Sequence, residues 1–299
     1  MQQSSMTLNE FMNRFPDEKS CREHLFNTRW SDGFKCPRCG HDKYYEIEDR
    51  KLYQCASCDY QASVTAGTIF HKSHTPLKIW FWAIFFVAKD KRGVSAAQLS
   101  REFPVSYPTA WNMLHKIREA MGERDSYYLL SNIIKVDECY IGSSTKDKKR
   151  GRGTEKAKVL VSLSVTEDNR PLFAKLDVIQ DLTTETIRER ITANFAPGSK
   201  VSTDGYTSYS RLEEQDFVHD KNVLSDGLDI DDVFDSVHTL ISNVKRFIIG
   251  TYHGLKDKHL QNYLDEYCYR FNRRFWHDQL FDRLLDASIE AKPTPNLVS

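Results

Sequence analysis

The sequence has no excess of either charge, no long apolar run and no cysteine framework suited to disulfides. Its 42 basic residues balance 42 acidic ones, so any contact with nucleic acid must come from local patches and not from an overall field. The most apolar run, residues 79–88, is too short to cross a bilayer, and the N-terminus does not resemble a signal peptide. We therefore expect a cytoplasmic protein without a membrane segment, in which cysteines stay reduced.

Four of the cysteines form two CxxC pairs, Cys36 with Cys39 and Cys55 with Cys58. The residues between the pairs include strand-like stretches within 44–53. Two such turns facing each other present four thiolates in the tetrahedral arrangement that zinc prefers. A redox CxxC pair is the weaker reading, because it would not require the second pair. The pattern predicts a zinc ribbon that depends on its metal for stability.

Two short amphipathic helices are expected in residues 1–30, separated near Pro16. Cys21 and His24 lie three residues apart in the second of them and could mimic a pair of metal ligands. Because the four later cysteines already complete a tetrahedral set, we interpret both as packing residues.

A helical segment with a candidate DNA-reading helix follows the ribbon. A helix is expected over 77–89, another after Ser95, and a third after 104–106, and helix, short turn, helix is the order of a helix-turn-helix. We expect the last helix to expose side chains that can touch phosphates and base edges. These are Tyr107, Thr109, Asn112, Lys116 and Arg118. A plain three-helix bundle is the alternative.

Residues 133–141 form an apolar, β-branched run that contains two consecutive acids, Asp137 and Glu138. Side chains alternate along a strand, so the two acids point to opposite faces. A carboxylate in a buried strand is costly unless solvent, a salt bridge or a metal compensates it. This strand therefore needs an explanation from the rest of the chain.

The order of the following elements resembles an RNase H-like domain. Strands are expected over 159–165 and 172–178, then a helix ending at Phe195 and a strand over 200–203 that ends in Asp204. In that order Asp137 and Asp204 lie side by side at the centre of the sheet. The fold class expected for the chain is therefore α+β and multidomain, with a ribbon, a helix-turn-helix-like segment and an RNase H-like domain with a mixed sheet.

Two charged stretches flank these strands. Residues 143–158 form a basic loop that is a candidate phosphate clamp. Its candidate DNA-binding residues are Lys148, Lys149, Arg150 and Arg152. Residues 213–235 are acid-rich, and we expect a strand and a solvated loop there, before helices over 237–249, 258–271 and 280–289.

Nine short motifs, spread from about residue 20 to 285, resemble those of one transposase group. They are Cys36-Pro-Arg-Cys-Gly, Tyr53-Gln-Cys-Ala-Ser-Cys, Thr68-Ile-Phe-His, Val136-Asp-Glu-Cys-Tyr-Ile-Gly, Gly151-Arg-Gly, Thr203-Asp-Gly-Tyr, Val244-Lys-Arg, Gly250-Thr-Tyr-His-Gly and Arg270-Phe-Asn-Arg-Arg. In this order they resemble bacterial insertion-sequence transposases that join a zinc ribbon to an ISXO2-like catalytic domain, relatives of the Merlin transposons.

The resemblance implies a DDE-type transposase. Such an enzyme binds terminal inverted repeats and uses two divalent ions to cleave DNA and transfer the freed strand to target DNA. Asp137 and Asp204 correspond to its first two ligands for magnesium or manganese. A homodimer or larger homo-oligomer on DNA is implied because two transposon ends are cut, as is association with the nucleoid.

The third catalytic position departs from the pattern of a full acidic triad. Counting seven residues back from Lys245, where members with a full triad carry glutamate, gives His238. Asn243 is the other candidate, because some members are described with asparagine there. Spacing favours His238, with Lys245 two turns along the same face and able to contact the scissile strand.

The missing glutamate keeps a second function open, a non-catalytic DNA-binding regulator or inactive transposase derivative. The Asp137 and Asp204 pair favours the enzyme, since a binding module has no reason to keep it. The expected domains are 1–70 for the N-terminal helices and zinc ribbon, 71–125 for the helix-turn-helix-like segment, 126–290 for the RNase H-like domain and 291–299 for a tail.

Overall fold

The computed structural model describes residues 6–142, 156–204, 206–209, 212, 216–222, 230–253 and 255–295. The chain divides into two compact units, one of residues 1–121 with 276–299 and one of residues 122–275. Each is described by itself. Across the described ranges, the search for a helix of sufficient length and hydropathy to span a membrane finds none.

Unit 1, the unit of residues 1–121 and 276–299, is mostly helical with one small sheet. Its elements are α1 (Leu8–Arg14), α2 (Glu18–Arg29), β1 (Tyr44–Ile47), β2 (Leu52–Cys55), β3 (Gln61–Ala62), α3 (Leu77–Lys89), α4 (Ala96–Glu102), most of α5 (Tyr107–Ser126) and α9 (Leu280–Glu290). Capping boxes at Thr7 and Asp17 begin the first two helices. The two helices predicted within residues 1–30 are therefore present.

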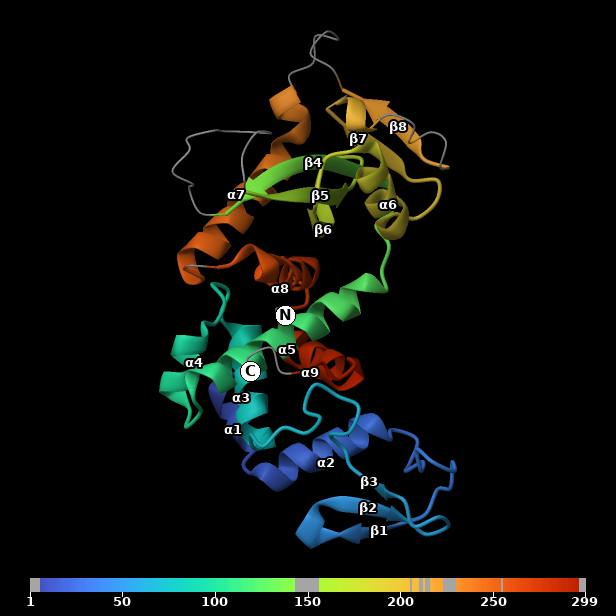
Figure 1. Cartoon of the computed structure of the whole chain (residues 1–299), viewed down its shortest axis with the longest axis vertical. Coiled ribbons are helices and arrows are strands. Elements are labelled where there is room, and N and C mark those ends of the chain that lie inside the picture. The colour runs from blue at the N-terminus through green and yellow to red at the C-terminus, as the bar shows by residue number, and fades with distance from the viewer. Residues whose placement is uncertain are drawn as a thin grey trace. The chain divides into compact units, whose positions relative to one another are not determined.

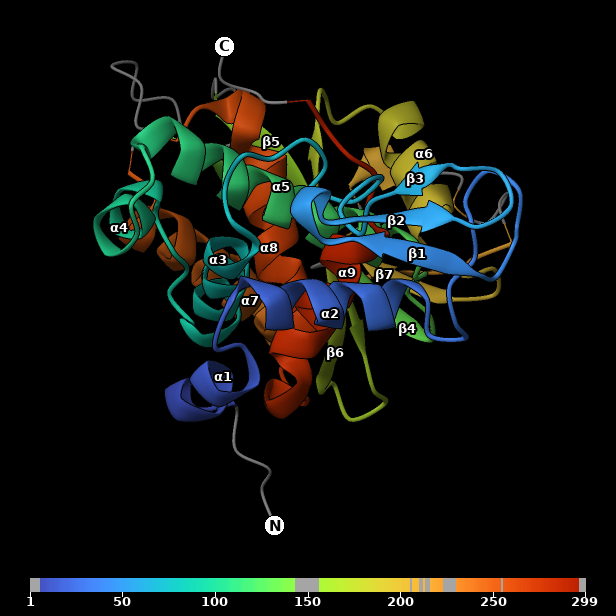
Figure 2. The same ribbon diagram turned by 90° about the horizontal axis from the view of Figure 1, so that it is seen from below.

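An aromatic cluster ties the C-terminal helix α9 to the N-terminal helices. The ring of Phe281 lies 5.6 Å from that of Phe11, edge to face, and 5.8 Å from that of Phe15. Arg14 also pairs with Asp282 at 2.6 Å. These contacts place residues 276–299 in unit 1, whereas the sequence pattern assigned residues up to 290 to the RNase H-like domain. Figures 1 and 2 both show α9 beside α3.

The small sheet is antiparallel, in the order β1-β2-β3. Helix α2 packs against it through Phe26, whose ring lies 4.6 Å from that of Tyr53 and 5.4 Å from that of Tyr44. Figure 2 shows α2 running alongside the β1–β2 hairpin. Aromatic burial thus supports the hairpin on one side.

Unit 2, residues 122–275, is built on a five-stranded mixed sheet in the order β6-β5-β4-β7-β8. The strands are β4 (Ile133–Ile141), β5 (Ala157–Val165), β6 (Pro171–Ile179), β7 (Lys200–Thr203) and β8 (Val218–Lys221). β4, β5 and β6 pair antiparallel, and β4, β7 and β8 pair parallel. The mixed sheet confirms the fold class expected from the sequence.

Helices cover both faces of this sheet. α6 (Thr184–Asn194) packs on one face, against Ile134, Val136 and Val201. α7 (Ile230–Thr251) and α8 (Leu260–Asn272) pack on the other face, in a core that includes Cys139 and Val161. Figure 1 shows α6 and α7 on opposite sides of the strands. Even-numbered residues of β4 therefore face α6 and odd-numbered residues face α7.

Helix α7 begins earlier than the acid content of its first turns suggested. The sequence pattern placed a loop through residue 235 and the helix start at Val237, but the helix begins at Ile230. Phe234, Val237, Ile241, Val244 and Ile248 are all buried at helical spacing. This apolar stripe supports a helix, so the expected loop is corrected to helix from residue 230 on.

Candidate active site and metal cluster

The site centres on Asp137, which lies in β4, the central strand of the sheet. β4 pairs parallel with β7, and Lys135 is the register partner of Ser202. Two residues further in the same register bring Asp137 opposite Asp204, which directly follows the end of β7. The two carboxylates predicted to lie side by side are therefore on neighbouring strands at the same level.

Asp137 faces helix α7, where it meets His238. The His238 Nε2 atom lies 3.5 Å from Asp137 Oδ2, and the side chain of Asp137 is 20% exposed while that of His238 is 43% exposed. The Asp137 carboxylate is partly exposed and lies beside an imidazole that solvent can reach, so a ligand can approach both groups. His238, which stands at the position that the full acidic triad fills with glutamate, is thus close enough to contact Asp137.

Burial, together with the charges of Glu138 and Asp204, raises the pKa of Asp137 to about 6. The backbone N–H of Glu138, which donates to Asp137 Oδ1 at 2.8 Å, and the nearby His238 act in the opposite direction. The physical cause is a carboxylate taken out of water next to other acids. A bound cation would remove that penalty.

Glu138 points to the other face of the sheet, as alternation requires. Its Oε2 atom accepts a hydrogen bond of 3.2 Å from the hydroxyl of Tyr209, which is fully buried. Burial, followed by the charge of Glu138, raises the pKa of Tyr209 well above its usual range. Glu138 therefore anchors the α6 side of the sheet and does not face Asp137's ligand side.

Lys245 lies on the same face of α7 as His238, two helical turns away. Its charge acts on the thiol of Cys139. The pKa of this thiol is raised to about 12, chiefly by burial, although Lys245 acts in the opposite direction. Cys139 follows Asp137 by two residues on β4 and shares its face. Asn243 is exposed, and five residues from His238 turn it about 140° around the helix. Of the two candidates for the third position, His238 is the one whose side chain lies 3.5 Å from the Asp137 carboxylate.

The buried side chain of Asn222, which no sequence pattern pointed to, lies next to Asp204. Thr203 pairs with Lys221 in the parallel β7–β8 register, so Asn222 lies opposite Asp204. Asn222 is 7% exposed, and its side-chain N–H donates to Ser202 Oγ at 2.8 Å and to the Thr203 carbonyl at 3.4 Å. It fastens the strand end that carries Asp204. No motif surrounds it, so only the register reveals it.

The four ribbon cysteines come together in unit 1. Sγ of Cys36 lies 3.6 Å from that of Cys58, Sγ of Cys39 lies 3.6 Å from that of Cys55, and all four sulfurs lie within 4.8 Å of one another. Four sulfurs 2.3 Å from a central zinc ion would stand about 3.8 Å apart. The donor set and its spacing fit zinc.

The four cysteines are the only group of three or more potential ligands that meets the 4.8 Å distance in the part of the chain the structure describes. Asp137, Asp204 and His238 are spaced more widely.

The residues predicted to contact DNA differ in their exposure to solvent. Tyr107 is 56% exposed, and Thr109 and Asn112 are partly exposed. The expected exposure of Lys116 and Arg118 is wrong, because they are only 9% and 2% exposed. The Arg118 guanidinium donates to the Val94 carbonyl at 3.2 Å, and burial lowers the pKa of Lys116. Lys148, Lys149, Arg150 and Arg152 lie outside the described residues.

Two segments of the chain match known protein families. Residues 129–272 match the ISXO2-like transposase domain, and residues 16–61 match the transposase zinc-ribbon domain. A protein of Halobacterium salinarum, described as an uncharacterized protein in transposable element ISH50, is 26% identical over 238 residues, which are 71% of this chain and 76% of that protein.

Two solved structures also show similarity. The Mos1 strand transfer complex is 14% identical, with a TM-score of 0.27, over 72% of this chain and 79% of that chain. The Mos1 transposase paired-end complex with left transposon end is 13% identical, with a TM-score of 0.25, over 68% of this chain and 78% of that chain.

The family matches, together with the mixed sheet and the four-cysteine ribbon, define a DDE-type transposase. More narrowly, the chain belongs to the insertion-sequence transposases in which a transposase zinc-ribbon domain precedes an ISXO2-like transposase domain. The two matched segments together span more than half of the sequence.

Proposed function

We propose that this transposase cleaves DNA at the terminal inverted repeats of its insertion sequence and transfers the freed strand to target DNA, using magnesium or manganese. The observation that carries the proposal is the register of β4 and β7, which sets Asp137 opposite Asp204. Oxygen ligands of this kind suit hard divalent cations. A bound cation would favour the ionised form of Asp137, whose pKa is raised to about 6, chiefly by burial.

The roles of the residues follow from their positions. Asp137 and Asp204 would hold the ions, which when bound activate the attacking hydroxyl and stabilise the leaving oxygen of the phosphodiester. His238, 3.5 Å from Asp137, takes the third position and fixes that carboxylate or adds a nitrogen ligand. Lys245, on the same helical face, binds a phosphate of the scissile strand.

Zinc in the four-cysteine cluster has a structural role in this proposal. Against burial, hydrogen bonds from the backbone N–H groups of Arg38 and Cys39 lower the pKa of Cys36 to about 7, whereas the pKa values of Cys39 and Cys58 in the same cluster are raised. A zinc ion among the four sulfurs would favour the thiolate in all of them. The metal would hold together the turn that precedes β1 and the turn that follows β2, at the open end of the hairpin.

Binding to DNA is proposed for two further places. The exposed side of α5 offers Tyr107, Thr109 and Asn112, and the basic loop over 143–158 stays a predicted phosphate clamp. Cutting two transposon ends calls for at least two subunits on the DNA. Such an enzyme would work where its DNA lies, in the cytoplasm.

The test is cleavage of a supercoiled plasmid that carries the element's own ends. With magnesium the wild-type protein is expected to nick it, while Asp137→Asn and Asp204→Asn lose about a thousandfold or more of the rate but still bind the DNA. Asp168→Asn, the same change on an exposed turn of unit 2, is the control. Binding without magnesium-dependent nicking by the wild-type protein would favour the regulator instead.

A further inference from the structure

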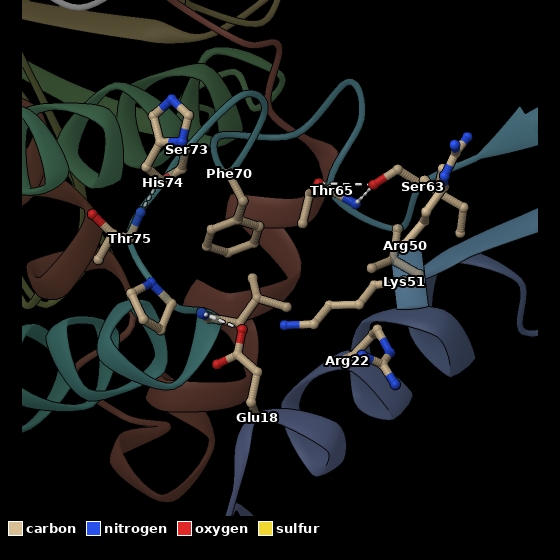
Figure 3. A pocket seen from close by; sticks show the side chains of 14 residues that line it. Glu18, Arg22, Arg50, Lys51, Ser63, Thr65, Phe70, Ser73, His74 and Thr75 are labelled. Atoms are coloured by element: carbon tan, nitrogen blue, oxygen red, sulfur yellow. Dashed lines mark hydrogen bonds between the residues drawn. The ribbon is translucent and has the colours of Figure 1, made fainter. Parts of the chain in front are cut away.

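A polar pocket of about 500 Å³ lies within unit 1, and the residues that line it do not include the four cysteines of the cluster. It is formed by α2, the tip of the β1–β2 hairpin and the segment that leads into α3. Its cations are Arg22, Arg50 and Lys51, and its acid is Glu18. Figure 3 shows Lys51 extending across the pocket toward Glu18, with Arg22 nearby on α2.

The single acid of the pocket is already engaged. The Glu18 carboxylate accepts hydrogen bonds of 2.9 Å from the backbone N–H groups of Leu77 and Lys78, at the start of α3. Pro76, the N-cap residue, offers no side-chain hydrogen bond to this helix start. Glu18 therefore neutralises the positive end of the helix dipole, and the three cations outnumber the acid of the pocket.

The cations have few partners of their own. The Nε atom of Arg22 is buried without a hydrogen-bond partner in the described ranges, although Nη2 of the same guanidinium forms an ion pair with Glu46 Oε1 at 3.7 Å. Arg22 also interacts with the hydroxyl of Tyr53. Arg50 and Lys51 are exposed, and neither is engaged in an ion pair within the described residues. A buried donor without a partner is costly unless a ligand supplies the acceptor.

The hairpin tip is shaped to present these side chains. A short 3₁₀ turn, Glu48–Arg50, ends at Lys51, whose φ of 55° is in the left-handed region. Hydroxyl groups complete the lining: Thr65 and Ser63 share a hydrogen bond of 2.9 Å, and Ser73 accepts from the Trp80 indole at 3.0 Å. Cations with hydroxyl donors are the groups that proteins use on phosphate oxygens.

We propose that this pocket binds backbone phosphates of duplex DNA, so that the ribbon and α2 grip DNA without reading its sequence. The proposal rests on the proposed function, because it assumes that DNA is the polyanion the protein meets. The pocket is larger than one phosphate group needs, and it has three cations, so contacts with two or more successive phosphates are expected. Base edges are not expected to enter it.

The experiment measures binding of the full-length, zinc-loaded protein to a fluorescein-labelled duplex of about 30 base pairs of mixed sequence, over a range of salt concentrations. Each lost phosphate contact lowers the slope of log K against log salt by about 0.9. Arg50→Gln/Lys51→Gln is therefore expected to flatten the slope by about 1.8. Both side chains are exposed, so the variant should fold, and its zinc content checks this.

The matched control is Lys19→Gln/Lys292→Gln, which removes the same charge from exposed positions of unit 1 that do not line the pocket. It is expected to keep the wild-type slope. An unchanged slope in Arg50→Gln/Lys51→Gln, or an equal flattening in the control, would overturn the proposal. Asp137→Asn in the same assay separates the two ideas: it is expected to bind with the wild-type slope whether or not it still nicks DNA.

Discussion

The His238 imidazole lies 3.5 Å from the Asp137 carboxylate, so a nitrogen base lies beside the central acid at the position that we propose as the third of the active site. In members with a full acidic triad, glutamate occupies this place. An imidazole, unlike glutamate, adds no negative charge to a site where burial and then the charges of Glu138 and Asp204 raise the pKa of Asp137. We therefore expect cation binding at this site to depend more strongly on the two aspartates.

The choice between His238 and Asn243 gives the first prediction. His238→Ala is expected to slow magnesium-dependent cleavage by about 100-fold, because it removes a group at Asp137. Asn243→Ala, on the exposed side of α7, is expected to stay within about threefold of wild type. Rates of plasmid nicking, measured at equal DNA occupancy, decide between them, and the reverse order of effects would transfer the role to Asn243.

Asn222 gives a second prediction, as a positioning residue for Asp204. Asn222→Ala removes the donors to Ser202 Oγ and the Thr203 carbonyl, so the end of β7 loosens. We expect the magnesium concentration for half-maximal cleavage to rise several-fold, with near-normal cleavage restored at high magnesium. A purely structural role would lower the melting temperature and leave the magnesium requirement unchanged.

The cysteine cluster gives a third prediction, read by metal content. Cys55→Ser is expected to lose the single zinc per chain and to melt unit 1 at lower temperature, because the ribbon depends on its metal. Cys21→Ala is the control: this thiol is fully buried but stands outside the cluster. It is expected to lose stability through packing alone and to keep its zinc. Zinc retained in Cys55→Ser would contradict a four-cysteine site.

His24 gives a prediction on pH and stability. Burial among the rings of Phe15 and Phe81, followed by the charge of Arg14, lowers its pKa, while Asp282 acts in the opposite direction. The folded state therefore binds fewer protons here than the unfolded state, and stability falls as the pH drops through the ordinary histidine pKa of about 6.5. Between pH 7.5 and 5.5 the melting temperature of His24→Leu is expected to fall less than that of wild type. Equal decreases would remove His24 as a cause.

The sequence predicted the strands well because their side-chain pattern is strong. The run over 133–141 reads as a strand from its β-branched residues, and the acid after 200–203 marks the next strand end. Alternation alone separated Asp137 from Glu138, and the structure places them on the two faces. The cysteine spacing likewise led to four sulfurs within 4.8 Å of one another.

Other features depend on contacts that sequence patterns do not encode. Helix α9 belongs to unit 1 because Phe281 packs against Phe11 and Phe15, which lie far away in the sequence. Arg118 was expected at the surface, but a backbone carbonyl of Val94 accepts from it in the interior. Asn222 carries no motif and stands out only through the register of two strands. Each of these outcomes rests on a tertiary contact.

We propose that Asp137 and Asp204 together hold the catalytic ions. Manganese binding to the full-length protein with DNA tests this, followed by electron paramagnetic resonance alongside cleavage in the same samples. We expect Asp137→Asn and Asp204→Asn each to lose both bound manganese and cleavage, while Glu138→Gln, the neighbouring acid on the opposite face, keeps both. Wild-type manganese binding in Asp137→Asn, or loss of manganese in Glu138→Gln alone, would contradict the assignment of Asp137 and Asp204 as the ligands of the ions.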